Sequence, residues 1–212
     1  MRRALCLSGL LLMLAWAPAH ARTVTIGSDL TAEAATFQSA PVDSAYWNTK
    51  LASGGRVTSP VRGEVSRVRL KGRINRSTLT RKRPDVVMHF QVLRPVRGGK
   101  VEAIVTTGNL KLPFGGGRNR LTTFNLQSMP ARICVRRGDH VALSTSGGFG
   151  PGYPDGAGFQ MFGPVAGSAF RAFTGAGKDM DGDVFRGAER SDQELLLQAT
   201  IATGRDARPF CR

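Results

Sequence analysis

The alternation of apolar and polar residues along the chain predicts an all-β protein. In the clearest run, 86–94, Val86, Met88, Phe90 and Val92 occupy one face of a strand. A period of two is typical of a strand with one buried face. Similar short runs recur between Gly-rich and Pro-rich turns along the chain. We therefore predict a single antiparallel β-sandwich, jelly-roll-like in type.

A second alternating pattern surrounds Gly138 and Asp139, within the segment Arg132 to Ser144. Apolar residues alternate with polar or small ones on both sides of these two turn-forming residues, which predicts a β-hairpin. Residues 137–139 also spell Arg-Gly-Asp, a tripeptide that some adhesion receptors bind. We favour the turn as its explanation, because a three-residue match recurs by chance.

Three further segments are predicted as strands. Residues 23–26 alternate as an opening strand. Within 61–71 the apolar positions change phase, from Val65 to Val68, which indicates a β-bulge. Residues 194–203, ELLLQATIAT, are predicted as a closing strand that is buried on both faces, with a short helix as the alternative.

Two segments are predicted as long surface loops that carry aromatic residues. Residues 31–59 contain Trp47, next to a tyrosine, and 147–167 contain Tyr153 and a short strand at 159–162. Trp47 and Tyr153 are candidates for stacking on a sugar ring. The alternative, which we favour for Trp47, is an aromatic plug at one end of the fold.

The first 21 residues are predicted to be a signal peptide. Arg2 and Arg3 precede an apolar stretch that ends at an Ala-x-Ala cleavage site, so residues 22–212 form the mature domain, secreted or at the cell surface. Later apolar runs are too short to span a bilayer. In an exported chain, the remaining cysteines Cys134 and Cys211 are expected to form a disulfide, with two free thiols as the alternative.

The chain is strongly basic. Its formal net charge is +15, which becomes +13 when Arg2 and Arg3 leave with the signal peptide. The cationic residues are dense between 62 and 83. They are explained either by a polyanion site or by a solvated strand face followed by an exposed loop, and we favour the solvated face. The candidate ligand-binding residues of this segment are Arg69, Arg73, Arg81, Lys82 and Arg83.

Candidate chemistry is sparse. Asp179, Asp181 and Asp183 alternate in the run KDMDGD, which resembles part of a calcium loop, although turn aspartates are the favoured explanation. The mature histidines, His89 and His140, lie in no nucleophile motif and are too few for zinc. We therefore expect neither enzymatic activity nor a cofactor.

The order of short motifs resembles that of predicted secreted proteins of unknown function from high-GC bacteria. The similarity rests on the strand at 24–30, Ser59-Pro60-Val61, the VLRP sequence at 92–95, the Gly138-Asp139 turn and the LLLQAT sequence at 195–200. This resemblance implies a jelly-roll-like β-sandwich without an assigned activity. The chain departs from the pattern in its basic charge.

These observations predict a secreted, non-enzymatic module that binds a glycan or an anionic cell-wall polymer. They give no reason to expect a specific nucleic-acid ligand or a membrane span, and they do not define the oligomeric state. Two alternatives are an extracellular polysaccharide hydrolase with the same fold, acting through a carboxylate pair, and a structural surface subunit.

Overall fold

The computed structural model describes residues 23–37, 44–75, 87–111, 119–129, 132–145, 158–175 and 180–212. In these ranges the regular structure consists of strands and short 3-10 turns. The strands are β1 (Thr23–Gly27), β2 (Thr36–Phe37), β3 (Ser44–Lys50), β4 (Gly63–Asn75), β5 (Val87–Val96), β6 (Lys100–Thr106), β7 (Leu110–Lys111), β8 (Arg120–Asn125), β9 (Cys134–Val135), β10 (His140–Thr145), β11 (Gly158–Phe173), β12 (Val184–Phe185), β13 (Ala188–Leu195) and β14 (Leu197–Ala202). The 3-10 turns are η2 (Leu126–Ser128), η3 (Gly204–Asp206) and η4 (Pro209–Cys211).

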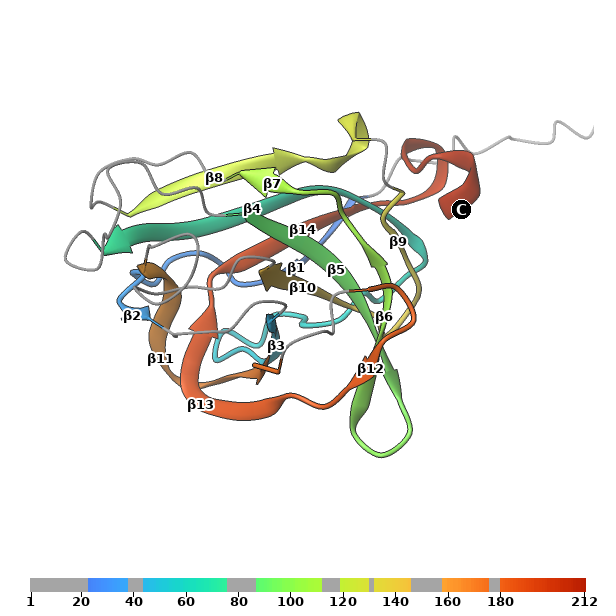
Figure 1. Ribbon diagram of the computed structural model, residues 1–212. Helices are drawn as coiled ribbons and strands as arrows, with labels where there is room; N and C mark the ends of the chain where they lie inside the picture. The colour runs from blue at the N-terminus through green and yellow to red at the C-terminus, as the bar shows by residue number, and fades with distance from the viewer. Residues whose placement is uncertain are drawn as a thin grey trace, which may run out of the picture.

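The strands form one branched antiparallel sheet. Its main path runs β1-β14-β4-β11-β3-β10-β5-β6-β12, while β8 and β9 also pair with β4, and β2 and β13 with β11. In Figure 1, β8, β4, β14 and β1 lie side by side, and β3, β11, β12 and β13 lie below them in this view. The predicted all-β class is therefore confirmed. The finer expectation of a two-sheet, jelly-roll sandwich stays a prediction, because the hydrogen bonds connect all the strands into one sheet.

One main hydrophobic core lies between the two parts of this sheet. Val68 and Leu70 of β4 share it with Phe90 and Val92 of β5, and all four side chains are almost completely buried. Phe90 also makes an edge-to-face contact with Phe124 of β8, with ring centroids 5.1 Å apart. The alternation along β5 therefore marks the core face, as the sequence predicts.

The predicted bulge in β4 is confirmed. Val65 pairs with Ile201 of β14, whereas Arg67 pairs with the preceding residue, Thr200, so Ser66 is the extra residue. The Ser66 hydroxyl donates a hydrogen bond to the Thr200 carbonyl oxygen at 3.2 Å. The bulge resets the alternation, so that Val65 and Val68 both face the core although three positions separate them.

The apolar run near the C-terminus is extended, as predicted. Leu195, Leu196 and Leu197 are at most 3% exposed. At Leu196 the chain passes from β13, which pairs with β11, to β14, which pairs with β1 and β4. Leu196 itself packs in a separate small cluster with Leu30 and Ala34. The run is continuously apolar because Leu195 and Leu197 pack in the main core, while Leu196 packs in the separate cluster.

The predicted hairpin at Arg132 to Ser144 is wrong. The turn exists, since the Asp139 amide donates to the Arg136 carbonyl oxygen at 3.1 Å and Gly138 has a φ of 90°. However, β9 pairs with β4, while β10 pairs with β3 and β5. The turn therefore joins strands that have different partners, and it packs against Ser59 through two backbone hydrogen bonds.

Two predicted loops also contain strands. The segment 31–59 includes β3, whose residues Ser44 to Asn48 are all buried, so it is not a surface excursion. Both faces of β3 are covered, which removes the alternation that would have marked it as a strand. Similarly, the short strand expected at 159–162 is the start of β11, which continues to Phe173.

Candidate functional site

The outward face of β4 carries a line of four cationic side chains. Arg67, Arg69, Lys71 and Arg73 alternate with buried residues, so they project from the same side of the strand. Alternate residues of a strand are about 7 Å apart along its axis, which sets the repeat of this line. We call these four residues the β4 basic face.

The neighbouring strands present neutral side chains beside the β4 basic face. On one side, Arg67 pairs with Thr200 and Arg69 with Gln198 of β14. On the other side, β8 contributes Leu121, Thr123 and Asn125, all exposed, opposite Lys71, Arg69 and Arg67 respectively. Figure 1 shows β8 and β14 along either side of β4. The cations therefore form a single row between neutral side chains of β8 and β14.

Neutral amides hold two of the arginines in place. Arg69 Nη1 donates to Gln198 Oε1 at 3.1 Å, and Arg73 Nε donates to Gln160 Oε1. Gln160 is itself fixed, because its Nε2 donates to the Ala35 carbonyl oxygen at 3.1 Å. Because glutamine carries no charge, these contacts orient the guanidinium groups without neutralising them. Each guanidinium has five N–H donors, so most of its donors are left for a ligand.

Lys71 has a different environment from the arginines. Its Nζ lies 2.9 Å from Glu33 Oε1 and also donates to the carbonyl oxygens of Leu30 and Thr31 at 3.2 and 3.3 Å. The hydrogen bond from Lys71 lowers the pKa of the Glu33 carboxyl below its usual value. Lys71 therefore ties the segment after β1 to the sheet, and its charge is paired. The arginines supply the unpaired charge of the row.

The candidate residues from the sequence have different outcomes. Arg69 and Arg73 lie on the same face of β4, with Arg67 and Lys71 beside them. The candidates at 81–83 and Tyr153 lie outside the described residues. The alternation after the bulge places Arg67 on the same face as Arg69 and Arg73. This pattern could have added Arg67 to the candidates, but the change of phase at the bulge obscures it in the sequence.

Trp47 is not a surface platform. Its side chain is 1% exposed and makes an edge-to-face contact with Phe185, with ring centroids 6.0 Å apart. It belongs to a second hydrophobic cluster, with Leu93 and Val101, on the opposite side of the sheet from the main core. Trp47 therefore plugs the fold. The expectation that it stacks on a sugar ring is wrong, because its side chain is buried.

The aspartates of the KDMDGD run form a turn where the structure describes them. Asp183 Oδ2 accepts a hydrogen bond from the Met180 amide at 3.1 Å, and Asp181 lies in the turn between them. Asp179 lies outside the described residues. The described part of the chain contains no cluster of three or more His, Cys, Asp or Glu side chains that could hold a metal ion.

His89 and His140 are both incorporated in the sheet. His89 is 7% exposed, and its Nδ1 lies 2.7 Å from the Thr107 carbonyl oxygen. Since a carbonyl oxygen only accepts, Nδ1 carries the proton of neutral His89. Burial lowers the pKa of His140, which pairs with Leu93 at the start of β10. Each ring is thus part of the packing of β5 and β10.

The carboxylate of the Arg-Gly-Asp sequence is buried. Asp139 is 1% exposed and accepts hydrogen bonds from Arg94 Nε and Nη2, both at 2.9 Å. It also accepts one from the Arg136 amide at 2.7 Å, across the turn. The hydrogen bonds to Asp139 raise the pKa of Arg94. This carboxylate stabilises the turn and is not accessible to a receptor, as the turn explanation requires.

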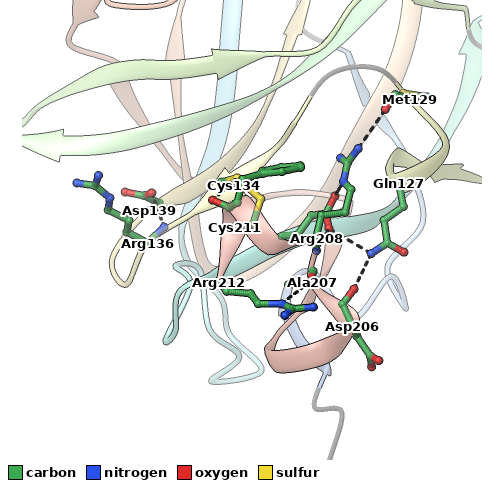
Figure 2. The surroundings of a disulfide bond; sticks show 12 residues. Gln127, Met129, Cys134, Arg136, Asp139, Asp206, Ala207, Arg208, Cys211 and Arg212 are labelled. Atoms are coloured by element: carbon green, nitrogen blue, oxygen red, sulfur yellow. Dashed lines mark hydrogen bonds and ion pairs between the residues drawn. A yellow bond between two sulfur atoms is a disulfide. The ribbon is translucent and has the colours of Figure 1, made fainter.

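A disulfide attaches the C-terminal segment to β9. Cys134 and Cys211 are bonded, with their Cα atoms 5.1 Å apart, which confirms the predicted pair (Figure 2). The ring of Phe210 lies beneath the guanidinium of Arg132, 4.0 Å from its centroid. The segment after β14, with η3 and η4, is therefore packed on the sheet. We call residues 203–212 the C-terminal clasp.

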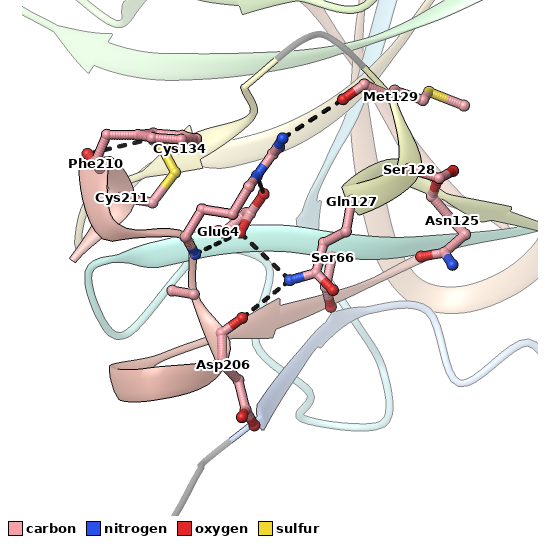
Figure 3. A network of polar contacts seen from close by, with 12 residues as sticks. Glu64, Ser66, Asn125, Gln127, Ser128, Met129, Cys134, Asp206, Phe210 and Cys211 are labelled. Atoms are coloured by element: carbon pink, nitrogen blue, oxygen red, sulfur yellow. Dashed lines mark hydrogen bonds and ion pairs between the residues drawn. A yellow bond between two sulfur atoms is a disulfide. The ribbon is translucent and has the colours of Figure 1, made fainter.

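The clasp covers a buried carboxylate at the start of β4. Glu64 is 0% exposed, and it accepts hydrogen bonds from the Arg208 amide at 2.8 Å and from Arg208 Nε (Figure 3). Gln127 Nε2 lies 3.3 Å from Glu64 Oε2 and 3.0 Å from the Asp206 carbonyl oxygen. Sequence reasoning missed this pair, because 144 positions separate its members and nothing local marks either one.

Glu64 therefore does not compete with a ligand for the cations of β4. Arg208 compensates its charge, and the clasp encloses its side chain. Along β4, the bulge at Ser66 lies between Glu64 and Arg67. Among the described residues, Glu33 and Asp29 are carboxylates near Lys71 of the β4 basic face, and Glu33 forms an ion pair with it.

Comparison of the chain with protein-family models, with curated proteins and with solved structures finds no match. The resemblance to secreted proteins of high-GC bacteria thus stays a prediction. None of the helices among the described residues is long and apolar enough to span a membrane.

Proposed function

We propose that the chain is a secreted or cell-surface module without enzymatic activity, and that it binds an anionic polymer through the β4 basic face. The observation that carries this proposal is the row of Arg67, Arg69 and Arg73 on one face of one strand, between strands with neutral side chains. A concave pocket is not needed for a linear polymer, which can lie along a flat sheet surface.

The whole chain supports this binding through its net charge. A mature charge of +13 attracts polyanions over about a Debye length, which is roughly 10 Å at 0.1 M salt. Such attraction is not specific by itself. Local specificity comes from Gln198 and Gln160, which hold two guanidinium groups in fixed orientations. Preorganised donors lose less side-chain entropy on binding.

The hypothesis that a glycan binds by stacking on an aromatic side chain has less support. Trp47 is enclosed, so the described residues leave it no face for a sugar ring. We therefore propose electrostatic binding, with an anionic glycan or an anionic wall polymer as the ligand.

The experiment compares two variants of the mature protein with equal loss of charge. One is the triple substitution R67Q, R69Q and R73Q on the β4 basic face. The other is R56Q, R136Q and R137Q, three exposed arginines that lie elsewhere on the surface. Binding to immobilised heparin is measured from 50 to 500 mM salt. The proposal expects the first variant to lose at least tenfold more affinity than the second.

Two results would count against this function. Equal losses in the two variants would mean that binding depends on net charge alone. Affinity that does not change between low and high salt would exclude ion pairing as its origin, because release of counterions makes such binding strongly salt-dependent.

A further inference from the structure

We propose that the preferred ligand is a base-free phosphodiester polymer, such as a polyol phosphate chain, bound lengthwise along β4. This inference rests on the proposed function and adds the chemical class and the orientation of the polymer. Its basis is the geometry of Arg67, Arg69 and Arg73, the groups that orient them, and the side chains of the flanking strands.

The charges of the row lie at spacings set by the two-residue repeat of the strand. Arg67 and Arg69 are about 7 Å apart along β4, and Arg69 and Arg73 are about 14 Å apart, with Lys71 between them. A row of this kind fits one extended chain that carries one charge per repeat. The six-bond repeat of an extended phosphodiester backbone is of the same length, so successive phosphates can face successive side chains of β4.

The donors of the row are guanidinium groups. Each presents a planar fork that binds phosphate, or carboxylate, through two parallel hydrogen bonds, whereas the ammonium of lysine acts as a point charge. The one lysine of the row, Lys71, is already paired with Glu33. The charges that remain are therefore all guanidinium groups. Arg69 and Arg73 each donate to one glutamine oxygen and keep further N–H groups.

Neutral polar side chains lie beside the row. Thr200 on β14, with Thr123 and Asn125 on β8, offer hydroxyl and amide groups to the oxygens of a polyol, whereas the Gln198 amide is already bonded to Arg69 and to the Ser28 carbonyl oxygen. None of these residues is aromatic. Proteins that bind single-stranded nucleic acids stack the bases on aromatic side chains. The described side chains beside the row offer the bases no such contact, which favours a polymer without them.

A uronate glycan fits the row less well. Its charges sit on rigid rings, and successive carboxylates turn about the chain axis, so they do not all face one straight row. A phosphodiester chain rotates freely between its phosphates and can turn each one toward the sheet.

The experiment measures affinity by calorimetry for three oligomers of equal charge number at one salt concentration. They are a glycerol phosphate oligomer, an oligogalacturonate and a single-stranded oligothymidylate. The inference expects the glycerol phosphate oligomer to bind at least tenfold more tightly than the oligogalacturonate, and no less tightly than the oligothymidylate.

Two variants test the structural basis. R67Q, R69Q and R73Q together should reduce the slope of log K against log salt by about 2, because three phosphate contacts are lost at roughly 0.7 each. R67K, R69K and R73K together keep the charge but remove the forked donors. This variant should still bind the polyanions, but at least fivefold more weakly than the native protein, because lysine offers no planar fork.

The outcomes separate the two proposals. If none of the three oligomers nor heparin binds, the proposed function fails and this inference fails with it. If phosphate and carboxylate oligomers bind equally, and the lysine variant behaves as the native protein does, anionic binding stands and the phosphodiester assignment is overturned. Tighter binding of the oligothymidylate than of the glycerol phosphate oligomer would overturn the base-free part.

Discussion

Glu64, which is 0% exposed, forms an ion pair with the partly exposed Arg208, and this pair joins the start of β4 to the C-terminal clasp. Removal of one partner of a fully buried pair costs about 3 to 5 kcal/mol, because it leaves a buried charge without compensation. Because Arg208 is partly exposed, we expect R208A to lower the free energy of unfolding by about 3 kcal/mol, the lower end of this range, measured by urea denaturation.

The matched control for this pair is the double substitution E64Q and R208M, which removes both charges. It should be clearly more stable than R208A, because no charge remains buried. If R208A and the double variant were equally stable, the effect of R208A would come from lost packing rather than from the unpaired carboxylate.

The disulfide and the ion pair should be coupled. C134S with C211S removes a link across 77 positions, worth about 4 kcal/mol on the chain-entropy model. In that variant the clasp is held less firmly, so R208A should cost less than it does in the oxidised protein. A double-mutant cycle by chemical denaturation measures the difference, and strict additivity would show that the two contacts act independently.

His140 should make the stability depend on pH. Burial lowers its pKa in the folded protein below the ordinary value of 6.5, so between these two values the unfolded chain binds the proton more readily. The free energy of unfolding should therefore fall as the pH drops through 6.5, and level off below the folded pKa. H140Q should reduce this dependence, as measured by thermal unfolding between pH 4 and 8. A pH profile that H140Q leaves unchanged would contradict the assignment.

Trp47 should report on the interior of the protein and not on ligand binding. It is 1% exposed and is the only tryptophan of the predicted mature chain, so its fluorescence should resist quenching by acrylamide until the protein unfolds. W47A should lower the stability by about 3 to 5 kcal/mol. W47F should cost less, because it keeps most of the ring contact with Phe185. Quenching in the native state comparable to that of free tryptophan would show that the ring is accessible.

The sequence predicted well those features that depend on neighbouring residues. The alternation along β5 identified Phe90 and Val92 as core residues, and the change of phase after Val65 identified the bulge. Arg69 and Arg73 were candidates because cationic residues are dense between 62 and 83, and the alternation after the bulge explains why both point outward. The cysteine pair followed from the expected export and from the even number of remaining cysteines.

Features that depend on distant partners could not be predicted in this way. The turn at Gly138 was recognised, but the partners of its two strands are decided by packing elsewhere in the fold. Burial of β3 on both faces concealed that strand, in which Trp47 lies. The partner of Glu64 lies 144 positions away, and the cations around Glu64 in the sequence, Arg62 and Arg67, are not the ones that it binds.

The extra residue, Ser66, divides β4 into two parts with different roles. Residues before it hold the clasp through Glu64, and residues after it carry the arginines, each half with its own alternation. Deletion of Ser66 would leave Val65, Arg67 and Val68 in strict alternation, so both halves would keep their orientation. A deletion at Val68 would instead turn every later arginine of β4 toward the core. The chain can therefore lose a residue at position 66 without reversing the orientation of either half of β4. The stretch 67–73 tolerates substitutions, but an insertion or deletion there would reverse the orientation of the side chains that follow.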